Sequence, residues 1–244
     1  MLTALKRFAW FWLKSPQRKQ LGYTTISIDL MGLLGLFGSK KSWETIWVCV
    51  GIKDRSDNVK RLVTSLSAIN GTGIFGLSIY DQGSTDSEAL HLWLQKHWNG
   101  ALVWESESGD FTRSAAFNRA IKQAKGDLIF ACDADMTLPP DLENTIRRYV
   151  RPKTAWFPIC QWQLNPENPS WKWLSAGTGL FAAHKKWHGQ AMVYDEKFQS
   201  WGGEDWDMFF RCYQSGIMPL RTRCKGLYHH WHESVKPDQY KNLF

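Results

Sequence analysis

The chain has 244 residues, 43% of them hydrophobic, which is typical of one globular domain of ordinary size with a substantial core. Its 30 basic and 23 acidic residues give a formal net charge of +7, which favours an anionic partner: nucleotide phosphates, nucleic acid or an acidic membrane surface. The five cysteines are odd in number and form no C-x-x-C pair, which argues against a disulfide framework or a zinc site and favours a reducing compartment.

The N-terminal residues 1–20 predict a short basic amphipathic helix that ends at Pro16. The apolar stripe of this helix has two interpretations, because it can lie in a membrane interface or pack on the domain that follows. The later apolar run 26–37 is interrupted by Asp29 and is too short to span a bilayer, so neither a transmembrane helix nor a cleavable signal is predicted. We expect residues 1–44 to be an amphipathic and linker extension and residues 45–244 to be the main domain.

From residue 46 onward, strand patterns alternate with helix patterns. Short apolar runs rich in β-formers predict strands over 46–50, 77–80, 101–104 and 128–132. Apolar residues at helical spacing predict helices around 59–66, 90–97, 117–124 and 140–150. Such alternation is typical of a parallel α/β sheet with right-handed crossovers. The aromatic-rich stretch 156–173 predicts instead an irregular, partly antiparallel segment lining a cleft, and the small residues 175–179 allow close backbone approach to a ligand or a neighbouring strand.

Two acidic residues, Asp133 and Asp135, follow the strand predicted over 128–132. Alternate residues of a strand point to the same side, and open α/β sheets bind ligands beyond the carboxyl ends of their strands, so both carboxylates can face one ligand. Mg²⁺ or Mn²⁺ on such carboxylates keeps positions for phosphate oxygens. The pattern does not decide by itself, because an Asp-x-Asp at a strand end is also common in solvated turns and helix caps.

Two further polar clusters stand near the end of the chain. The segment 201–207 (WGGEDWD) opens a predicted helix, and its three acids also suit the positive end of a helix dipole. His229 and His232 have a spacing that can converge on one metal ion, with a surface tract as the alternative. The G-x-G-x-x-G match at 71–76 is not a dinucleotide fingerprint, because it follows a helix and precedes a strand.

Together these segments resemble the nucleotide-sugar glycosyltransferases of the GT-A fold, within the large family 2 group and near the β-1,4-galactosyltransferases and chondroitin-polymerising enzymes. The resemblance covers roughly residues 45 to 235 in order. It rests on the D-Q-G-S-T-D turn at 81–86, the F-T-R at 111–113 with Asn118, the D-A-D at 133–135, the segment 201–207 and His232. It implies an α/β GT-A fold, with a mostly parallel central sheet flanked by helices and a short N-terminal helical extension.

The same resemblance implies a role for each motif residue. The side chains expected to bind the nucleotide-sugar donor are Asp81, Arg55, Arg113, Asp133, Trp201 and Gly202. The residues expected to hold Mn²⁺ or Mg²⁺ are Asp135, His232 and His229. Asp205 is expected to be the catalytic base, Glu204 to hold the acceptor sugar, and Asp207 to cap the helix.

The expected activity is inverting, metal-dependent transfer of a hexose or N-acetylhexosamine from a UDP-sugar to a hydroxyl of a glycan or lipid-linked acceptor. Two alternatives come from other classes: a catalytically silent nucleotide- or sugar-binding module on the same fold, and a basic, tryptophan-rich nucleic-acid binder. The chain carries no recognised nucleic-acid motif, so no nucleic-acid partner is expected. We expect a cytoplasmic protein, with residues 1–20 as the element that would bring it to the cytoplasmic membrane face.

Overall fold

The computed structural model describes residues 44–70, 75–175, 177–198 and 203–232. Its main sheet has seven strands in the order β10-β6-β9-β4-β1-β2-β3. The strands are β1 (Ile46–Ile52), β2 (Phe75–Asp81), β3 (Ala101–Ser106), β4 (Leu128–Ala131), β6 (Thr154–Trp156), β9 (Phe181–His184) and β10 (Met218–Leu220). Only β9 within this sheet runs antiparallel to its neighbours, β4 and β6. The predicted mostly parallel sheet is therefore confirmed.

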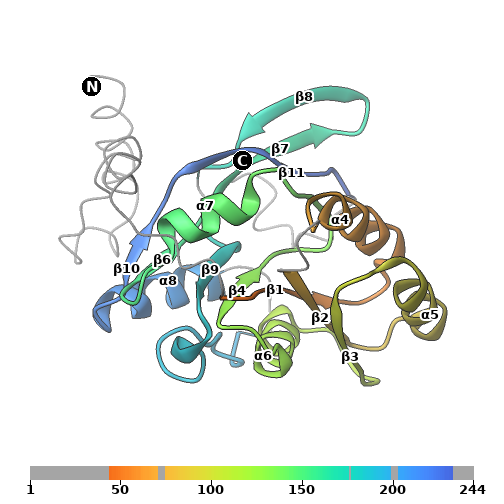
Figure 1. Cartoon of the computed structure of the whole chain (residues 1–244), viewed down its shortest axis with the longest axis horizontal. Helices are drawn as coiled ribbons and strands as arrows, with labels where there is room; N and C mark the ends of the chain where they lie inside the picture. Colours follow the sequence, from red (N-terminus) through yellow and green to blue (C-terminus); the bar gives the residue numbers. More distant parts are fainter. Residues whose placement is uncertain (1–43, 71–74, 176, 199–202, 233–244) are drawn as a thin grey trace.

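Helices cover both faces of this sheet (Figure 1). They are α4 (Ser56–Ile69), α5 (Ser87–His97), α6 (Arg113–Gln123), α7 (Leu142–Tyr149) and α8 (Glu204–Gln214), with a short 3₁₀ helix, η2 (Lys185–Trp187). One core packs α4, α5 and α7 against the sheet, and a second core packs α6 and α8 against its other face. Along β1, Val48 belongs to the first core and Cys49 to the second, which is why the central strands appear in the sequence as continuous apolar runs.

A second sheet of four strands has the order β5-β11-β7-β8. Its strands are β5 (Met136–Thr137), β7 (Ile159–Asn165), β8 (Asn168–Trp173) and β11 (Arg223–His229). The antiparallel pair β7–β8 forms the hairpin at the top of Figure 1 and pairs Trp162 with Lys172. This part of the chain is more regular than the prediction of an irregular segment, because β11 pairs with β7 and extends the hairpin into a sheet.

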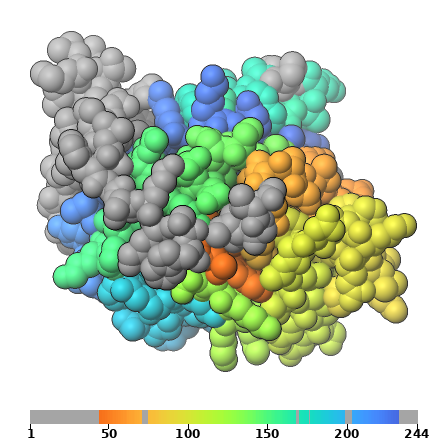
Figure 2. Space-filling view, in the orientation of Figure 1, coloured from red at the N-terminus to blue at the C-terminus, as the bar shows by residue number. Residues whose placement is uncertain are grey.

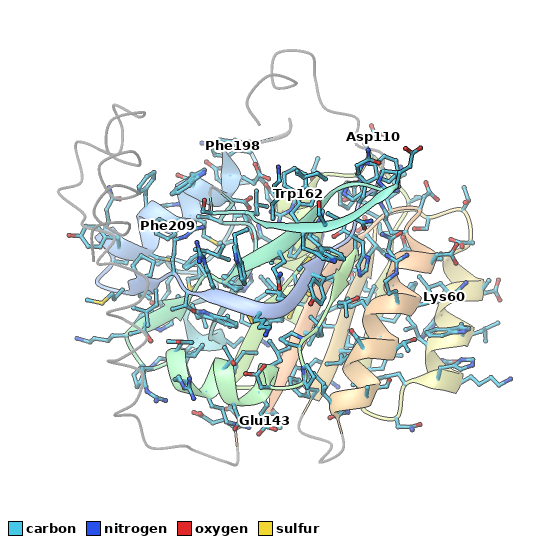
Figure 3. The ribbon with its side chains drawn as sticks, turned by 90° about the horizontal axis from the view of Figure 1, so that it is seen from above. Lys60, Asp110, Glu143, Trp162, Phe198 and Phe209 are labelled. Carbon is cyan, nitrogen blue, oxygen red and sulfur yellow. The ribbon has the colours of Figure 1, made fainter. Side chains whose placement is uncertain are left out.

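The parallel strands define two edges of the main sheet. At the carboxyl edge lie the loops that follow Ile52, Asp81 and Ala131, the ends of β1, β2 and β4. Figure 3 labels Asp110, Trp162 and Phe198 along this edge. The amino edge is the opposite one, where these strands begin. No helix among the described residues is both long and apolar enough to cross a membrane. The helix predicted in residues 1–20, together with Trp201 and Gly202, lies outside the described residues.

Candidate active site

Asp81 is the last residue of β2 and is completely buried at the carboxyl edge. Its Oδ1 accepts hydrogen bonds from the backbone N–H of Ser84, at 3.0 Å, and from the Ser84 hydroxyl, at 2.6 Å. Its Oδ2 is buried and has no hydrogen-bond partner among the described residues. A buried carboxylate oxygen without a donor is costly unless a ligand supplies one, so Asp81 offers an acceptor for an N–H or O–H group.

The loop after β1 is tied to the loop after β2 through Asp54. Its Oδ1 accepts hydrogen bonds from the backbone N–H of Thr85, at 2.9 Å, and from the Thr85 hydroxyl, at 3.1 Å. These bonds lower the pKa of the Asp54 carboxyl, with the backbone N–H of Thr85 as the main cause. Arg55 follows at the start of α4, where its side chain is exposed and its Nη1 lies 3.4 Å from the Asp54 carbonyl oxygen. Arg55 is thus placed at the same edge as Asp81.

Arg113, the first residue of α6, joins three separate parts of the chain. Its Nε donates to Asp133 Oδ1 at 3.1 Å, and its Nη1 donates to Asp205 Oδ1 at 2.6 Å. Its Nη2 donates to the Gly179 carbonyl oxygen at 2.9 Å, and Glu204 Oε1 lies 3.6 Å from its Nη1. One guanidinium therefore serves the carboxylates that follow β4 and begin α8.

Aromatic rings and a buried amide fix the position of Arg113. The guanidinium carbon lies 4.5 Å from the ring centre of Phe117 and 5.5 Å from that of Tyr194. Tyr194 is held by Asn118, whose Nδ2 donates to the Tyr194 carbonyl oxygen and whose Oδ1 accepts from the Tyr194 N–H, both at 2.9 Å. The motif residue Asn118 therefore acts through Tyr194, which it holds next to Arg113. Tyr194 has no signal in the sequence, because it reaches Arg113 only through the fold.

The carboxyl group of Asp205 is a weaker acid than usual. Burial raises its pKa to about 6, against the opposing charge of Arg113, and the nearby carboxylates of Glu204 and Asp133 add to the rise. The Asp205 side chain keeps 24% of its surface exposed, whereas the side chain of Glu204 keeps only 6%. Asp205 can therefore both meet a substrate and accept a proton near neutral pH.

Gly179 leaves no room for a side chain beside these groups. A Cβ atom at this position would lie 2.9 Å from both Arg113 Nη2 and Asp205 Oδ2. The small residues 175–179 predicted close backbone approach to a ligand or a strand. What approaches Gly179 is the ion pair between Arg113 and Asp205.

Asp133 and Asp135, which strand alternation predicted can face one ligand, have different protein partners. The chain turns after β4, so the carboxylate of Asp133 meets Arg113, while that of Asp135 meets His229 of β11 and His232 of the loop after it. Asp135 Oδ2 lies 2.9 Å from His232 Nε2, and Asp135 Oδ1 lies 3.4 Å from His229 Nε2. The two acids of the motif therefore serve different clusters.

The cluster of Asp135, His229 and His232 has the composition of a metal site. Each residue offers one ligand atom, and these atoms all lie within 4.8 Å of one another. Asp135 is buried, and its Oδ1 has no hydrogen-bond partner among the described residues. Burial alone would raise the pKa of Asp135, but the hydrogen bond from His232 and the charges of both histidines lower it. One carboxylate and two imidazoles fit a cation such as Mn²⁺, which accepts oxygen and nitrogen ligands.

His230 lies between the two candidate ligands in the sequence, just after β11, and its imidazole has other contacts. Its Nε2 lies 2.7 Å from the Thr137 hydroxyl, and its ring meets the edge of Trp171. Its backbone N–H donates to the Asp135 carbonyl oxygen at 2.9 Å. His230 thus supports Asp135 through the backbone, and its imidazole contacts Thr137 and Trp171.

Asp207, the third acid of segment 201–207, is engaged elsewhere. Its Oδ2 accepts from Arg211 Nε at 2.8 Å, and Arg211 donates onward to the carbonyl oxygens of Ala191 and Val193. No side chain caps the start of α8, where Gly203 occupies the N-cap position. The expected helix cap is therefore wrong for Asp207, which instead anchors the loop before residue 194.

Comparisons with known proteins identify the family of the chain. The family model for glycosyl transferase family 2 matches residues 47–206. The mouse N-acetyl-beta-glucosaminyl-glycoprotein 4-beta-N-acetylgalactosaminyltransferase 1 is 26% identical over 194 residues, covering 75% of this chain and 19% of the relative. Human chondroitin sulfate N-acetylgalactosaminyltransferase 1 is 26% identical over 161 residues, covering 55% of this chain and 30% of the relative. The chain thus spans between a fifth and a third of the length of these relatives.

Solved structures share the fold at low sequence identity. The S. aureus TarS structure in complex with UDP-GlcNAc has a TM-score of 0.63 at 14% identity, and the match covers 78% of this chain and 59% of that one. GalNAc-T7 with UDP, GalNAc and Mn²⁺ has a TM-score of 0.63 at 17% identity, covering 82% and 46%. Because the family model matches more than half of the chain and the fold is that of nucleotide-sugar transferases, the chain belongs to glycosyl transferase family 2, on a GT-A fold.

Proposed function

We propose that this protein is an inverting, metal-dependent glycosyltransferase that moves a hexose or N-acetylhexosamine from a UDP-sugar to a hydroxyl of a glycan or lipid-linked acceptor. One observation carries the proposal. The two residues of the Asp133–Asp135 motif connect a candidate metal cluster, Asp135 with His229 and His232, to a candidate base, Asp205, through Arg113. This arrangement supports a donor site and a proton acceptor side by side at one edge of the sheet.

Asp81 is the residue we assign to the nucleoside part of the donor. Its unpartnered Oδ2 can accept a hydrogen bond from the uracil or ribose, and the bonds from Ser84 hold the carboxylate in place. Arg55 and Arg113 are the cations that we assign to the donor side, and Trp201 and Gly202 of segment 201–207 are assigned to it as well. The similar solved structures support a UDP donor, since they include a TarS complex with UDP-GlcNAc and a GalNAc-T7 complex with UDP and GalNAc.

We assign Asp135, His229 and His232 to a divalent cation, Mn²⁺ or Mg²⁺. When bound, the cation would stabilise the negative charge that gathers on the leaving diphosphate. The protein contributes a buried carboxylate oxygen that lacks a partner and two imidazole nitrogens within reach of it. The backbone bond from His230 to Asp135 and the pairing of β11 with β5 keep the ligands in register. The similar GalNAc-T7 structure is a complex with Mn²⁺, which supports the choice of ion.

Asp205 is the residue we assign as the base. The acceptor oxygen forms a bond to the anomeric carbon, its proton passes to Asp205, and the bond from that carbon to UDP breaks with its electron pair leaving on UDP. Attack from the side opposite UDP inverts the configuration. Arg113 keeps the Asp205 carboxylate at a fixed place, while Glu204 contributes charge to this cluster and is our candidate contact for the acceptor sugar.

The free, buried cysteines suit a reducing, cytoplasmic compartment.

A panel of nucleotide sugars tests the proposal. UDP release is measured for each donor, with varied acceptors, in Mn²⁺ and in EDTA. We expect turnover with at least one UDP-sugar, in Mn²⁺ only. Binding of UDP without turnover of any donor on any acceptor would favour a catalytically silent binding module on the same fold. Undiminished turnover in EDTA would remove the metal from the proposal.

A further inference from the structure

A basic surface lies at the amino edge, on the side of the sheet opposite the candidate active site. Three segments come together there: the end of α6 with residues up to 128, the stretch 148–154, and the stretch 184–190. The cyan, green and lime atoms of these segments adjoin one another at the lower left of Figure 2. Their basic residues are Lys122, Lys125, Arg148, Arg151, Lys153, Lys185 and Lys186, and their one acidic residue is Asp127.

Hydrogen bonds join these segments into one surface. Lys185 Nζ donates to the Ala124 carbonyl oxygen, so the 3₁₀ helix η2 lies against the end of α6. Trp187 Nε1 donates to the Pro152 carbonyl oxygen at 3.0 Å, which attaches the same helix to the stretch 148–154. The Met218 N–H donates to the Lys153 carbonyl oxygen at 2.8 Å and adds the start of β10. We call the seven basic residues, with Trp187 and Met218, the amino-edge patch.

The patch carries more positive than negative charge, because its described segments hold seven basic residues and one acid, Asp127. Lys122, Lys125, Arg148, Lys153 and Lys186 are all exposed. Burial lowers the pKa of the neighbouring His188, and the positive charges of Lys185 and Lys122 lower it further. The amino edge therefore presents an exposed basic surface.

Helix dipoles explain part of this pattern. Lys122 and Arg148 stand in the last turns of α6 and α7, where cations compensate the negative ends of helices. Lys125, Lys153 and Lys186 do not, because they lie in the connections and in η2. Two apolar side chains also stand among the cations: Met218 is 44% exposed, and the Trp187 ring lies 5.1 Å from Lys186 Nζ. Apolar and aromatic groups among lysines are typical of surfaces that rest on a bilayer interface.

We propose that the amino-edge patch docks on an anionic lipid bilayer and turns the candidate active site away from it. The lysines and arginines meet the headgroups, and the exposed Met218 enters the interface. The first described residue, Glu44, precedes β1 at this same edge, so residues 1–43 join the domain beside the patch. The basic amphipathic pattern of residues 1–20 belongs to the part of the chain that precedes Glu44. The proposal stands independently of the chemistry at the carboxyl edge.

Vesicle binding by the full chain tests this orientation. Binding is measured by sedimentation with vesicles of phosphatidylcholine alone and with vesicles that contain about 30% phosphatidylglycerol, which makes their surface strongly negative. The variant Lys122→Gln, Lys153→Gln, Lys186→Gln removes three charges of the patch, one from each segment. At roughly 1 kcal/mol per cation near an anionic surface, we expect about a 100-fold loss of affinity for the anionic vesicles.

A matched variant separates the patch from net charge. Arg61→Gln, Lys172→Gln, Lys225→Gln removes the same charge from exposed positions on α4, β8 and β11. We expect it to bind anionic vesicles within about threefold of the unchanged chain. Equal losses of vesicle affinity in the two variants would overturn the proposal. No loss of affinity in the first variant would also overturn it and would leave residues 1–43 as the membrane contact. Tighter binding to an oligonucleotide than to the anionic vesicles would overturn it in favour of a nucleic-acid partner. Unchanged thermal unfolding of both variants shows that the losses are not unfolding.

Discussion

Arg113 and Asp205 are 92 residues apart in the sequence and joined by a 2.6 Å hydrogen bond in the structure. The bond places the candidate base beside the guanidinium that also holds Asp133. Three carboxylates, those of Asp133, Glu204 and Asp205, surround this single cation. Burial raises the pKa of Asp205 and the neighbouring carboxylates add to the rise, while Arg113 opposes it and holds the carboxylate in place.

Changing Asp205 to Asn should reduce turnover by about 10²- to 10⁴-fold, roughly 3 to 5 kcal/mol in the barrier, because the amide keeps the shape and loses the basicity. UDP affinity in Mn²⁺, measured by calorimetry, should change little, since the donor is held by other residues. Asp207→Asn is the control on the same helix. It breaks the pair with Arg211, so its effect should fall on thermal stability. If Asp205→Asn keeps near-normal turnover while Asp207→Asn is inactive, the assignment of Asp205 as the base is wrong.

The pH dependence of kcat/KM should rise with pH through about 6, because the base must be deprotonated to accept a proton and the pKa of Asp205 is raised to about 6. Arg113 opposes that rise, so Arg113→Met should move the acid limb to higher pH by about one pH unit or more. Glu204→Gln removes a neighbouring negative charge and should move the limb to lower pH. Carboxyl NMR of Asp205 in the free protein measures the same directions without turnover. Shifts of the same sign in both variants would contradict this account of the cluster.

Changing Asp135 to Ala should weaken UDP binding in Mn²⁺ and leave the weaker binding measured in EDTA unaltered, because the carboxylate acts through the ion. His232→Ala should act in the same direction. His230→Ala is the matched control, since its imidazole contacts the hydroxyl of Thr137. Calorimetric titration of UDP with and without Mn²⁺ makes the comparison. A loss in His230→Ala as large as that in His232→Ala would place the ion elsewhere.

Changing Gly179 to Ala should lower turnover by at least about tenfold, because the added Cβ would stand 2.9 Å from both Arg113 Nη2 and Asp205 Oδ2 and force the pair apart. Gly177→Ala is the control two residues away, where the added Cβ meets only the side chain of Leu174, at 3.1 Å. Turnover and thermal unfolding of the two variants are compared side by side. Equal activity of both would mean that the pair has room to shift without loss.

The sequence by itself determined the fold class and the motifs of the site. Central strands buried on both faces must be continuous apolar runs, and helices packed on one face must repeat their apolar residues, so local periodicity was sufficient to predict the alternation from β1 to α7. The acids and histidines were visible for a related reason. They stand at strand and helix ends, where apolar patterns break off at Asp81, Asp133 and Glu204.

Only the tertiary structure decided how these residues are grouped. Strand alternation predicted that Asp133 and Asp135 can face one ligand, and the turn after β4 decides their protein partners, Arg113 for one and the histidines of β11 and the loop after it for the other. The hydrogen bonds of Arg113, the place of Gly179 and the support from Tyr194 join segments between 15 and 92 residues apart. No local pattern records such contacts, because they depend on which strand ends and helix starts the sheet order brings together at one edge.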